Sequence, residues 1–349
     1  MATRIVGIDF GARALRAVEV EGALRDRPTL RRYFEVPIPA GVVRSGEVID
    51  LAAASAAIRR LWSGGKFSTK NVVLGVGNQR VLARDIELPR MTQAQLRESL
   101  QYHVQDKLPM PINEAVLDFF PISEGIGEGG PVMNGLLVAA SKEAVLANVN
   151  AVVKAGLKPV EVDLIPFAVA RTQLRGLRGD GVIALIDVGA ETTTVVVTEN
   201  SVPQFVRMIP AGGSDVTRGI MSRLSLGEEA ADGTKVRMGL VAFGGGTPDQ
   251  QLAMEAIASV TGELLESIRN TITYYDNTHA AARVDRIVLS GGGARLEGFA
   301  AALRELARTN IVVVDPLETL NVARALRTMR AAERDSLTVA LGLALGSKN

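Results

Sequence analysis

The sequence predicts an α/β fold of two lobes, with a smaller β/α subdomain inserted in the first. The length of 349 residues exceeds the ~150 residues of an ordinary single domain. A strand followed by Asp-x-Gly and a second strand occurs at Asp9 and again at Asp187. A further apolar strand runs into Ser290-Gly291-Gly292-Gly293. A weak motif that recurs in the same strand context in each half indicates two related lobes.

Composition excludes several classes of function. The chain has no cysteine, which rules out disulfides, zinc–thiolate sites and thiol nucleophiles, and its two histidines, His103 and His279, lie too far apart for a metal site or a Ser-His-Asp hydrolase. The net charge of +1 attracts neither nucleic acid nor an anionic membrane. No apolar run reaches the ~18 residues of a membrane span, and the first residues do not resemble a signal peptide. We expect a cytoplasmic protein.

Three units are expected along the chain. The first lobe comprises residues 1–79, completed by about 160–180 and by a C-terminal helix at 335–349. The inserted subdomain comprises residues 80–159. The second lobe comprises residues 181–334, with a part of its own inserted at about 214–275.

The elements of the first lobe follow from local patterns. Residues 5–8 and the alternating residues 15–20 predict a hairpin with glycine at its tip. Asp50 is expected to cap a helix over 51–61, which Gly64-Gly65 would end. A strand is expected at 72–76. Residues 337–345 are apolar on nearly every side, so this helix should be buried in the core and not lie on a membrane.

The inserted subdomain is predicted to be β-α-β-β-α. Thr92 and Gln95 have the spacing of a capping box at the start of its first helix. Gly125-x-Gly127-x-x-Gly130 matches the dinucleotide fingerprint, but it opens no helix and lies among glutamates. We interpret it as a flexible hairpin loop. The strands are expected at 81–88, 115–122 and 133–140.

The second lobe repeats the strand–turn–strand beginning of the first and continues with helices. Strands are expected at 182–186 and 192–198, helices at 216–224, 228–238 and 255–275, and a final strand, helix and strand at 287–289, 299–308 and 311–314.

The two Asp-x-Gly turns suit a polyphosphate. Glycine at a tight turn lets backbone N–H groups approach phosphate closely, and an adjacent aspartate can hold a hydrated Mg²⁺ that bridges phosphate oxygens. Two such turns facing each other would clamp a nucleotide, with Asp9 and Asp187 holding the metal through water. Arg16 could add positive charge, and Gly291–Gly293 would allow close approach of the ribose or base.

These motifs resemble those of the superfamily of actin, Hsp70 and sugar kinases, which implies a two-lobed actin-like ATPase fold with a ribonuclease H-like core and ATP with Mg²⁺ as ligands. The resemblance lies in the two phosphate motifs, the adenosine motif and the first connecting segment, which correspond to Asp9-x-Gly11, residues 187–193, residues 287–295 and residues 163–171.

The resemblance narrows to PilM, a family of cytoplasmic type IV pilus assembly proteins that shares an inserted (SHS2) subdomain with the division protein FtsA. It covers the whole chain in order and is carried by residues 86–92, 108–111, Asp118, 155–163 and 340–345. It implies binding of the cytoplasmic N-terminal segment of the membrane protein PilN. It also implies contact with the pilus inner-membrane platform and its motor ATPases, self-association, and location at the inner membrane only through partners.

The resemblance also implies a set of nucleotide-binding residues. Asp232 and Lys235 stand where relatives have Glu-x-x-Lys touching ribose and base, and Glu266 and Arg269 share a helix face that could reach the adenosine. The complete set is Asp9, Gly11, Ala12, Arg13, Arg16, Asp187, Gly189, Ala190, Glu191, Thr192, Thr193, Gly212, Gly213, Asp232, Lys235, Glu266, Arg269, Gly291, Gly292, Gly293 and Arg295.

Departures from the superfamily pattern predict slow or negligible ATP hydrolysis. Ala12 and Arg13 replace the usual Ser or Thr, and Glu191 would repel a γ-phosphate unless it points away. Ile165 stands where active relatives have the Gln or Glu that orients water. Asp163 is the candidate catalytic residue instead. The alternatives are an active actin-like ATPase or small-molecule kinase, or an FtsA-like division filament protein.

A groove between the first lobe and the insert is expected to hold the PilN segment as an extended peptide. Each candidate residue could instead belong to the core of the insert. The candidates are Leu88, Met91, Leu96, Leu100, Leu108 and Met110.

Overall fold

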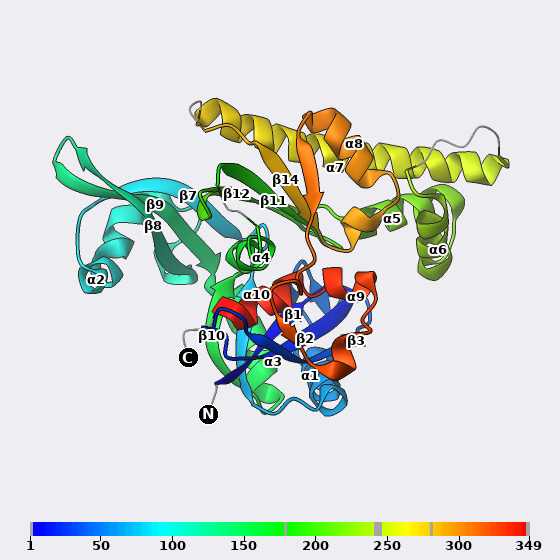
Figure 1. Ribbon diagram of the computed structural model, residues 1–349, viewed down its shortest axis with the longest axis horizontal. Helices are drawn as coiled ribbons and strands as arrows, with labels where there is room; N and C mark the ends of the chain where they lie inside the picture. The colour runs from blue at the N-terminus through cyan, green and yellow to red at the C-terminus, as the bar shows by residue number, and fades with distance from the viewer. Residues whose placement is uncertain (1–2, 178–179, 241–245, 280–281, 347–349) are drawn as a thin grey trace.

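Each lobe is built on one β-sheet, and a small subdomain projects from one side of the molecule (Figure 1). The computed structural model describes residues 3–177, 180–240, 246–279 and 282–346. The predicted two-lobed α/β fold is confirmed. Among the described helices, none has both the length and the apolar character needed to cross a bilayer.

The first sheet has six strands in the order β10-β6-β1-β2-β3-β16. β1 pairs antiparallel with β2 and parallel with β6, which confirms the predicted hairpin. β3 was not expected from the sequence, because most of its residues are only half-buried and show no clear alternation. The strands are β1 (Arg4–Phe10), β2 (Ala14–Glu21), β3 (Thr29–Pro37), β6 (Asn71–Val76), β10 (Lys158–Leu164) and β16 (Asn321–Val322).

Helices cover both faces of this sheet, which explains why β1 is apolar along nearly its whole length. Val6 and Ile8 join the core under α1 (Leu51–Gly65) and α3 (Lys142–Lys154), whereas Ile5 joins the core under α10 (Thr338–Gly346). α10 is buried as predicted for the apolar C-terminal helix; residues 347–349 lie outside the described residues. A short hairpin, β4 (Val43–Arg44) and β5 (Glu47–Val48), lies beside α3.

The N-cap of α1 is confirmed, whereas its end differs from the prediction. Asp50 Oδ1 accepts hydrogen bonds of 2.9 Å from the N–H groups of Ala52 and Ala53. Gly64 and Gly65 lie inside the last turn, and the left-handed C-cap falls on Lys66. A Cβ at Gly64 would overlap the ring of Phe34, so this glycine is needed for packing and not for ending the helix.

The small subdomain is a three-stranded antiparallel sheet with one helix (Figure 1). The predicted capping box at Thr92 is present. The glycine-rich stretch is not the flexible loop we expected: Gly125 pairs with Val132 and Gly127 with Gly130, so both strands continue to a two-residue turn. The elements are β7 (Val81–Pro89), α2 (Gln93–Val104), η1 (Gln105–Lys107), η2 (Ile112–Glu114), β8 (Ala115–Gly127) and β9 (Gly130–Ser141).

The second sheet has the order β13-β12-β11-β14-β15. α7 begins earlier than predicted, because Thr247 and Gln250 form a capping box and Pro248 occupies the first turn. The elements are β11 (Val182–Val188), β12 (Thr193–Glu199), β13 (Val202–Ile209), α5 (Gly213–Leu224), α6 (Glu228–Met238), α7 (Pro248–Thr278), β14 (Arg286–Ser290), η3 (Gly293–Arg295), α8 (Phe299–Ala307) and β15 (Asn310–Val313).

The two lobes meet through α4 (Ile165–Gln173), which packs against α10 of the first lobe and against β11 and β12 of the second (Figure 1). Ala168 belongs to the core beneath α10, whereas Ala170 packs with Ile183 and Leu185 of the second sheet. After β15 the chain returns from the second lobe to the first, where β16 is followed by η4 (Arg324–Leu326) and α9 (Ala331–Asp335). This arrangement leaves a cleft between the lobes.

Candidate functional site

A cleft of about 920 Å³ lies between the two lobes and is lined by both. The β1–β2 turn forms part of the first-lobe wall, and the β11–β12 turn faces it from the second lobe. The turn before α5, the glycines after β14 and one face of α6 complete the second wall. Eighteen predicted residues line it: Asp9, Gly11, Ala12, Arg13, Arg16, Asp187, Gly189, Ala190, Glu191, Thr192, Gly212, Gly213, Asp232, Lys235, Gly291, Gly292, Gly293 and Arg295.

Three other predicted residues are not brought to the cleft. Thr193 is buried behind the turn, where its hydroxyl donates to the carbonyl of Ala211 at 2.8 Å. Glu266 and Arg269 lie on α7 away from the lining, and Arg269 donates to Asn270 at 3.1 Å. The helix face that the sequence suggested for the adenosine therefore points elsewhere, and α7 contributes Thr261 and Leu264 to the lining instead.

The two Asp-x-Gly turns have the same length and the same crowding at their glycine. Four residues separate Phe10 from its partner Leu15, and four separate Val188 from Thr193. A Cβ at Gly11 would come within 2.8 Å of a carbonyl three residues later, and a Cβ at Gly189 would do the same at 2.8 Å. Only glycine keeps these turns tight, so the backbone forms a cradle that a side chain would fill.

Glycines also bring the other second-lobe segments close to the β11–β12 turn. A Cβ at Gly212 would lie 2.5 Å from the carbonyl oxygen of Gly189. A Cβ at Gly291 would overlap the carbonyl of Val188, and its φ of +91° lies in the left-handed region. The backbone of the three segments therefore packs directly together, which suits the close approach of phosphate and ribose.

The two aspartates differ in their charge compensation. Burial raises the pKa of Asp9, and the charge of Arg16, whose Nη1 lies 3.5 Å away, offsets part of this rise. Burial raises the pKa of Asp187 to about 6, although Ser290 Oγ donates to it at 2.5 Å. The charge of Asp9 also raises the pKa of Asp187. A hydrated divalent cation between them would relieve this repulsion, so the residues present fit a magnesium site.

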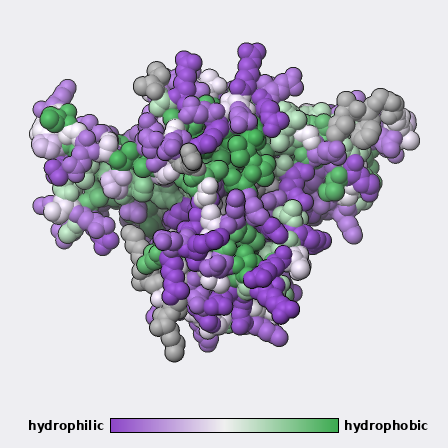
Figure 2. Space-filling view, in the orientation of Figure 1, coloured by the Kyte–Doolittle hydropathy of each residue, from purple (hydrophilic) through white to green (hydrophobic). Residues whose placement is uncertain are grey.

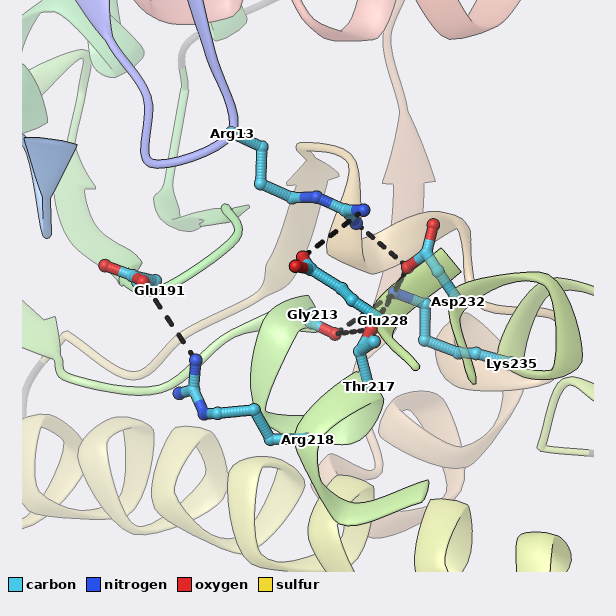
Figure 3. A network of polar contacts seen from close by, with 8 residues as sticks. All are labelled: Arg13, Glu191, Gly213, Thr217, Arg218, Glu228, Asp232 and Lys235. Carbon is cyan, nitrogen blue, oxygen red and sulfur yellow. Dashed lines mark hydrogen bonds and ion pairs between the residues drawn. The ribbon is translucent and has the colours of Figure 1, made fainter. Parts of the chain in front are cut away.

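A polar network joins α6 to α5 and to the β1–β2 turn (Figure 3). Asp232 Oδ1 accepts from Lys235 Nζ at 2.6 Å, from Thr217 Oγ1 at 3.0 Å and from Arg13 Nη1 at 2.9 Å. Partial burial opposes the charge on Asp232, but the hydrogen bonds from Arg13 and Lys235 outweigh it and lower its pKa to about 2. Asp232 is therefore ionised at neutral pH and holds Lys235 toward the cleft.

Glu191 turns its carboxylate toward the first lobe. Its Oε2 accepts from the backbone N–H of Ser45 at 2.8 Å, and Arg218 Nη1 lies 4.0 Å from Oε1 (Figure 3). The residue still borders the cleft. The repulsion of a γ-phosphate expected from this side chain is reduced by these two contacts.

Asp163 is not available as a catalytic base. Its Oδ1 accepts from the N–H of Leu164 at 2.7 Å, and its Oδ2 forms an ion pair with Arg171. It does not line the cleft, whereas Ile165 does. β10 ends at Leu164 and α4 begins at once, so Asp163 pairs with Arg171 of α4 and does not border the cleft.

Sequence patterns missed several lining residues. Asp335, Ser336 and Thr338 reach the cleft from the C-terminal segment, and Ser45 reaches it from the β4–β5 turn. Thr261 Oγ1 is buried and has no hydrogen-bond partner in the described residues. No motif marks these positions. Asp335, Ser336 and Thr338 reach the cleft only because the chain returns to the first lobe after the second.

Two of the candidate groove residues are core residues of the small subdomain. Leu88 and Leu100 are 2% and 5% exposed and pack in one cluster with Val104 and Phe119. They cannot line a surface groove. Leu96 and Leu108 pack against the same cluster and are partly buried.

Two lobes that carry paired Asp-x-Gly turns on opposite sides of one cleft define an actin-like ATPase fold. Solved structures share it over nearly the whole chain. EutJ from Carboxydothermus hydrogenoformans has a TM-score of 0.59 at 17% identity, covering 99% of this chain and 91% of that chain. MreB 5 of Spiroplasma citri bound to AMPPNP has a TM-score of 0.53 at 12% identity, covering 98% and 95%.

The chain belongs to the family described as Type IV pilus assembly protein PilM, which matches residues 7–348. A chain of a solved PilM-PilN type IV pilus biogenesis complex is 28% identical, with a TM-score of 0.84 over 99% of this chain and 98% of that one. The cell division protein FtsA of Bacillus subtilis (strain 168) is 22% identical over 321 residues, 80% of this chain and 72% of FtsA. FtsA of Escherichia coli (strain K12) is 25% identical over 288 residues, 73% and 66%.

Proposed function

We propose that this chain binds ATP with Mg²⁺ between its lobes and acts as an actin-like scaffold in type IV pilus assembly. The family supports the pilus role. The observation that carries the nucleotide proposal is the meeting of two glycine cradles, Gly11 and Gly189, on opposite walls of one cleft. Backbone N–H groups there would bind phosphate oxygens, and Arg16 would balance their charge.

Magnesium would be held through water by Asp9 and Asp187, and it would supply the positive charge that a buried acidic pair and a polyphosphate both need. Asp232 and Lys235 would bind the ribose end. Hydrolysis is proposed to be slow, because the wall carries Ile165 and the side chain of Asp163 is engaged by Arg171. The nucleotide would then set the angle between the lobes.

Calorimetric titration with Mg-ATP tests the nucleotide proposal. Asp187→Ala is expected to weaken binding about 100-fold while the far-ultraviolet circular dichroism stays unchanged. Asp106→Ala, which removes an exposed aspartate of the small subdomain, is the matched control and should bind as the parent does. Equal affinity of the two variants for Mg-ATP would contradict the assignment of Asp187 to the nucleotide site. Rapid release of phosphate from ATP by the parent would overturn the scaffold role.

The partner is proposed to be the cytoplasmic N-terminal segment of a PilN-type membrane protein, which would hold this chain at the cytoplasmic face of the inner membrane. β10 is the outermost strand of the first sheet on the side of the small subdomain (Figure 1). An apolar hollow lies between that subdomain and the first lobe (Figure 2). Val162 of β10 is 38% exposed. An extended peptide could add to such a strand and place apolar side chains in the hollow.

A pull-down with synthetic N-terminal PilN-type peptides tests this site. Val162→Lys should lower capture by about tenfold or more, the effect of losing one buried anchor. Val313→Lys is the matched control, because Val313 is an exposed valine on β15, the outermost strand of the second sheet. Undiminished capture after replacing residues 80–160 would refute a site that uses the small subdomain.

A further inference from the structure

In each Asp-x-Gly turn, the residue two positions after the glycine reaches across the cleft to the other lobe. These residues are Arg13 and Glu191. Arg13 of the β1–β2 turn donates to Asp232 of α6 at 2.9 Å, and its Nη2 lies 3.8 Å from Glu228 (Figure 3). At the equivalent place in the β11–β12 turn, Glu191 accepts from the N–H of Ser45 at 2.8 Å. Each lobe therefore supplies one charged arm that is bound by the opposite lobe.

The Arg13 contact engages the group proposed to bind the ribose. Asp232 Oδ1 already accepts three hydrogen bonds, from Arg13, Thr217 and Lys235. A hydroxyl of a ligand cannot add a fourth bond to this oxygen without displacing a donor. The backbone of Arg13 is anchored in the first lobe, since its carbonyl accepts from the N–H of Ile38 at 3.1 Å. The arm is thus tied to the first lobe and its tip to the second.

We propose that Arg13 is a latch that holds the lobes closed and limits the rate at which a magnesium–nucleotide enters and leaves the cleft. The inference rests on the proposed nucleotide function and adds its regulation. Ser45–Glu191 and Arg295–Asp335, the latter at 3.9 Å, are further polar contacts between the lobes. Loss of Arg13 alone therefore loosens the lobes without separating them.

The competing role for Arg13 is that of a nucleotide-binding residue, which the resemblance implies and which for an arginine means contact with phosphate. The two roles predict opposite signs. Loss of a latch raises the association rate constant, because entry requires open lobes. Loss of a positive charge at a phosphate site lowers it, because the electrostatic attraction of the anion weakens. Glu191 gives no such separation, since removing its negative charge and removing its contact both raise the association rate.

Stopped-flow binding of a fluorescent ATP analogue with Mg²⁺ measures both rate constants. Arg13→Ala should raise the association and the dissociation rate constants about two- to fivefold, the change in open population expected from one half-exposed ion pair. Arg218→Ala is the matched control: its partners Asp215 and Glu191 both belong to the second lobe, so it removes a nearby charge but no contact between lobes. Its association rate should not rise. An unchanged or lower association rate for Arg13→Ala overturns the latch.

Lobe opening can be measured without nucleotide. Spin labels at Arg60→Cys on α1 and Glu305→Cys on α8 occupy exposed positions in opposite lobes, and the chain has no other cysteine. Pulsed electron–electron double resonance should give longer distances between the two spin labels when Arg13→Ala is added. An unchanged distance distribution overturns the latch. If the parent binds no nucleotide, the proposed function fails, and this distance measurement still decides whether Arg13 holds the lobes together.

Discussion

The β1–β2 turn and the β11–β12 turn have the same length and the same Asp-x-Gly motif, but different charges surround their aspartates. In each, four turn residues follow Asp-x, and a Cβ added to the glycine would lie at the same distance from a carbonyl oxygen. The residue opposite Asp9 across the hairpin is Arg16, whereas the residue opposite Asp187 is Thr194. The repeated turn thus fixes the position of each aspartate. Burial raises the pKa of both, and the cross-strand Arg16 offsets part of this rise at Asp9.

The strands that lead into these turns also differ. Two residues before Asp9 lies Gly7, and two residues before Asp187 lies Leu185. α10 lies against β1 at Gly7, where a Cβ would overlap the carbonyl of Ala340 and come within 2.8 Å of the N of Ala344. Leu185 instead fills a core with Ala170 and Val288. At this position β1 therefore packs directly against the backbone of α10, whereas β11 packs through the side chain of Leu185.

The largest effect on stability is expected when the close contact between β1 and α10 is disturbed. Gly7→Ala should lower the free energy of unfolding by about 3 kcal/mol, because the added methyl group meets a helix backbone that cannot move without repacking the first lobe. Urea denaturation measures the change. The control is Gly262→Ala on α7, where a Cβ has open space; it should stabilise the protein by about 0.5–1 kcal/mol. Equal stability of Gly7→Ala and the parent would refute the close packing of α10.

Replacing each aspartate by asparagine compares the cost of its charge in the two turns. Asp187→Asn should raise the free energy of unfolding at pH 7 by up to about 3 kcal/mol, since a pKa raised from 3.8 to about 6 corresponds to this energy at ~1.36 kcal/mol per pKa unit. Asp9→Asn should give a smaller gain, because it also leaves Arg16 without one of its two carboxylate partners. The same denaturation curves test both, and a larger gain for Asp9→Asn would contradict this account.

The pH dependence of stability follows from the same shift. Because Asp187 holds its proton more tightly in the folded than in the unfolded chain, folding is favoured at low pH by this group, and the contribution is lost as pH rises from about 4 to about 6. The gain from Asp187→Asn over the parent should therefore be near zero below pH 4 and reach its full size above pH 6. Urea midpoints measured at pH 4, 5, 6 and 7 check the trend. A gain that does not change with pH would exclude Asp187 as its source.

The smallest expected difference is between the glycine variants of the two turns. Gly11→Ala and Gly189→Ala should each cost about 1–3 kcal/mol, because both place a Cβ 2.8 Å from a carbonyl oxygen. The two losses should agree within about 0.5 kcal/mol, the usual precision of additivity for separate sites. Thermal unfolding followed by circular dichroism is sufficient. A large difference between the variants would show that the turns are not mechanically equivalent.

Turn and cap chemistry could be predicted because it is local. The capping box at Thr92, the N-cap at Asp50 and the two Asp-x-Gly hairpins depend on residues a few positions apart. The rotation of a helix could not be predicted in the same way. Glu266 and Arg269 share a helix face, but α7 turns its Thr261 side to the cleft. Spacing defines a face and cannot say which neighbour covers it.

The sequence by itself determined the two-lobed α/β plan, the repeated turns and the buried nature of the C-terminal helix, since these follow from periodicity and glycine placement. Only the tertiary structure decided that Asp163 faces Arg171, that Asp187 has a pKa of about 6, and that Arg13 crosses to Asp232. The reason is that burial and Coulomb interactions depend on how the elements pack: Asp187 and Ser290, and Arg13 and Asp232, are more than a hundred residues apart, and folding alone brings them together.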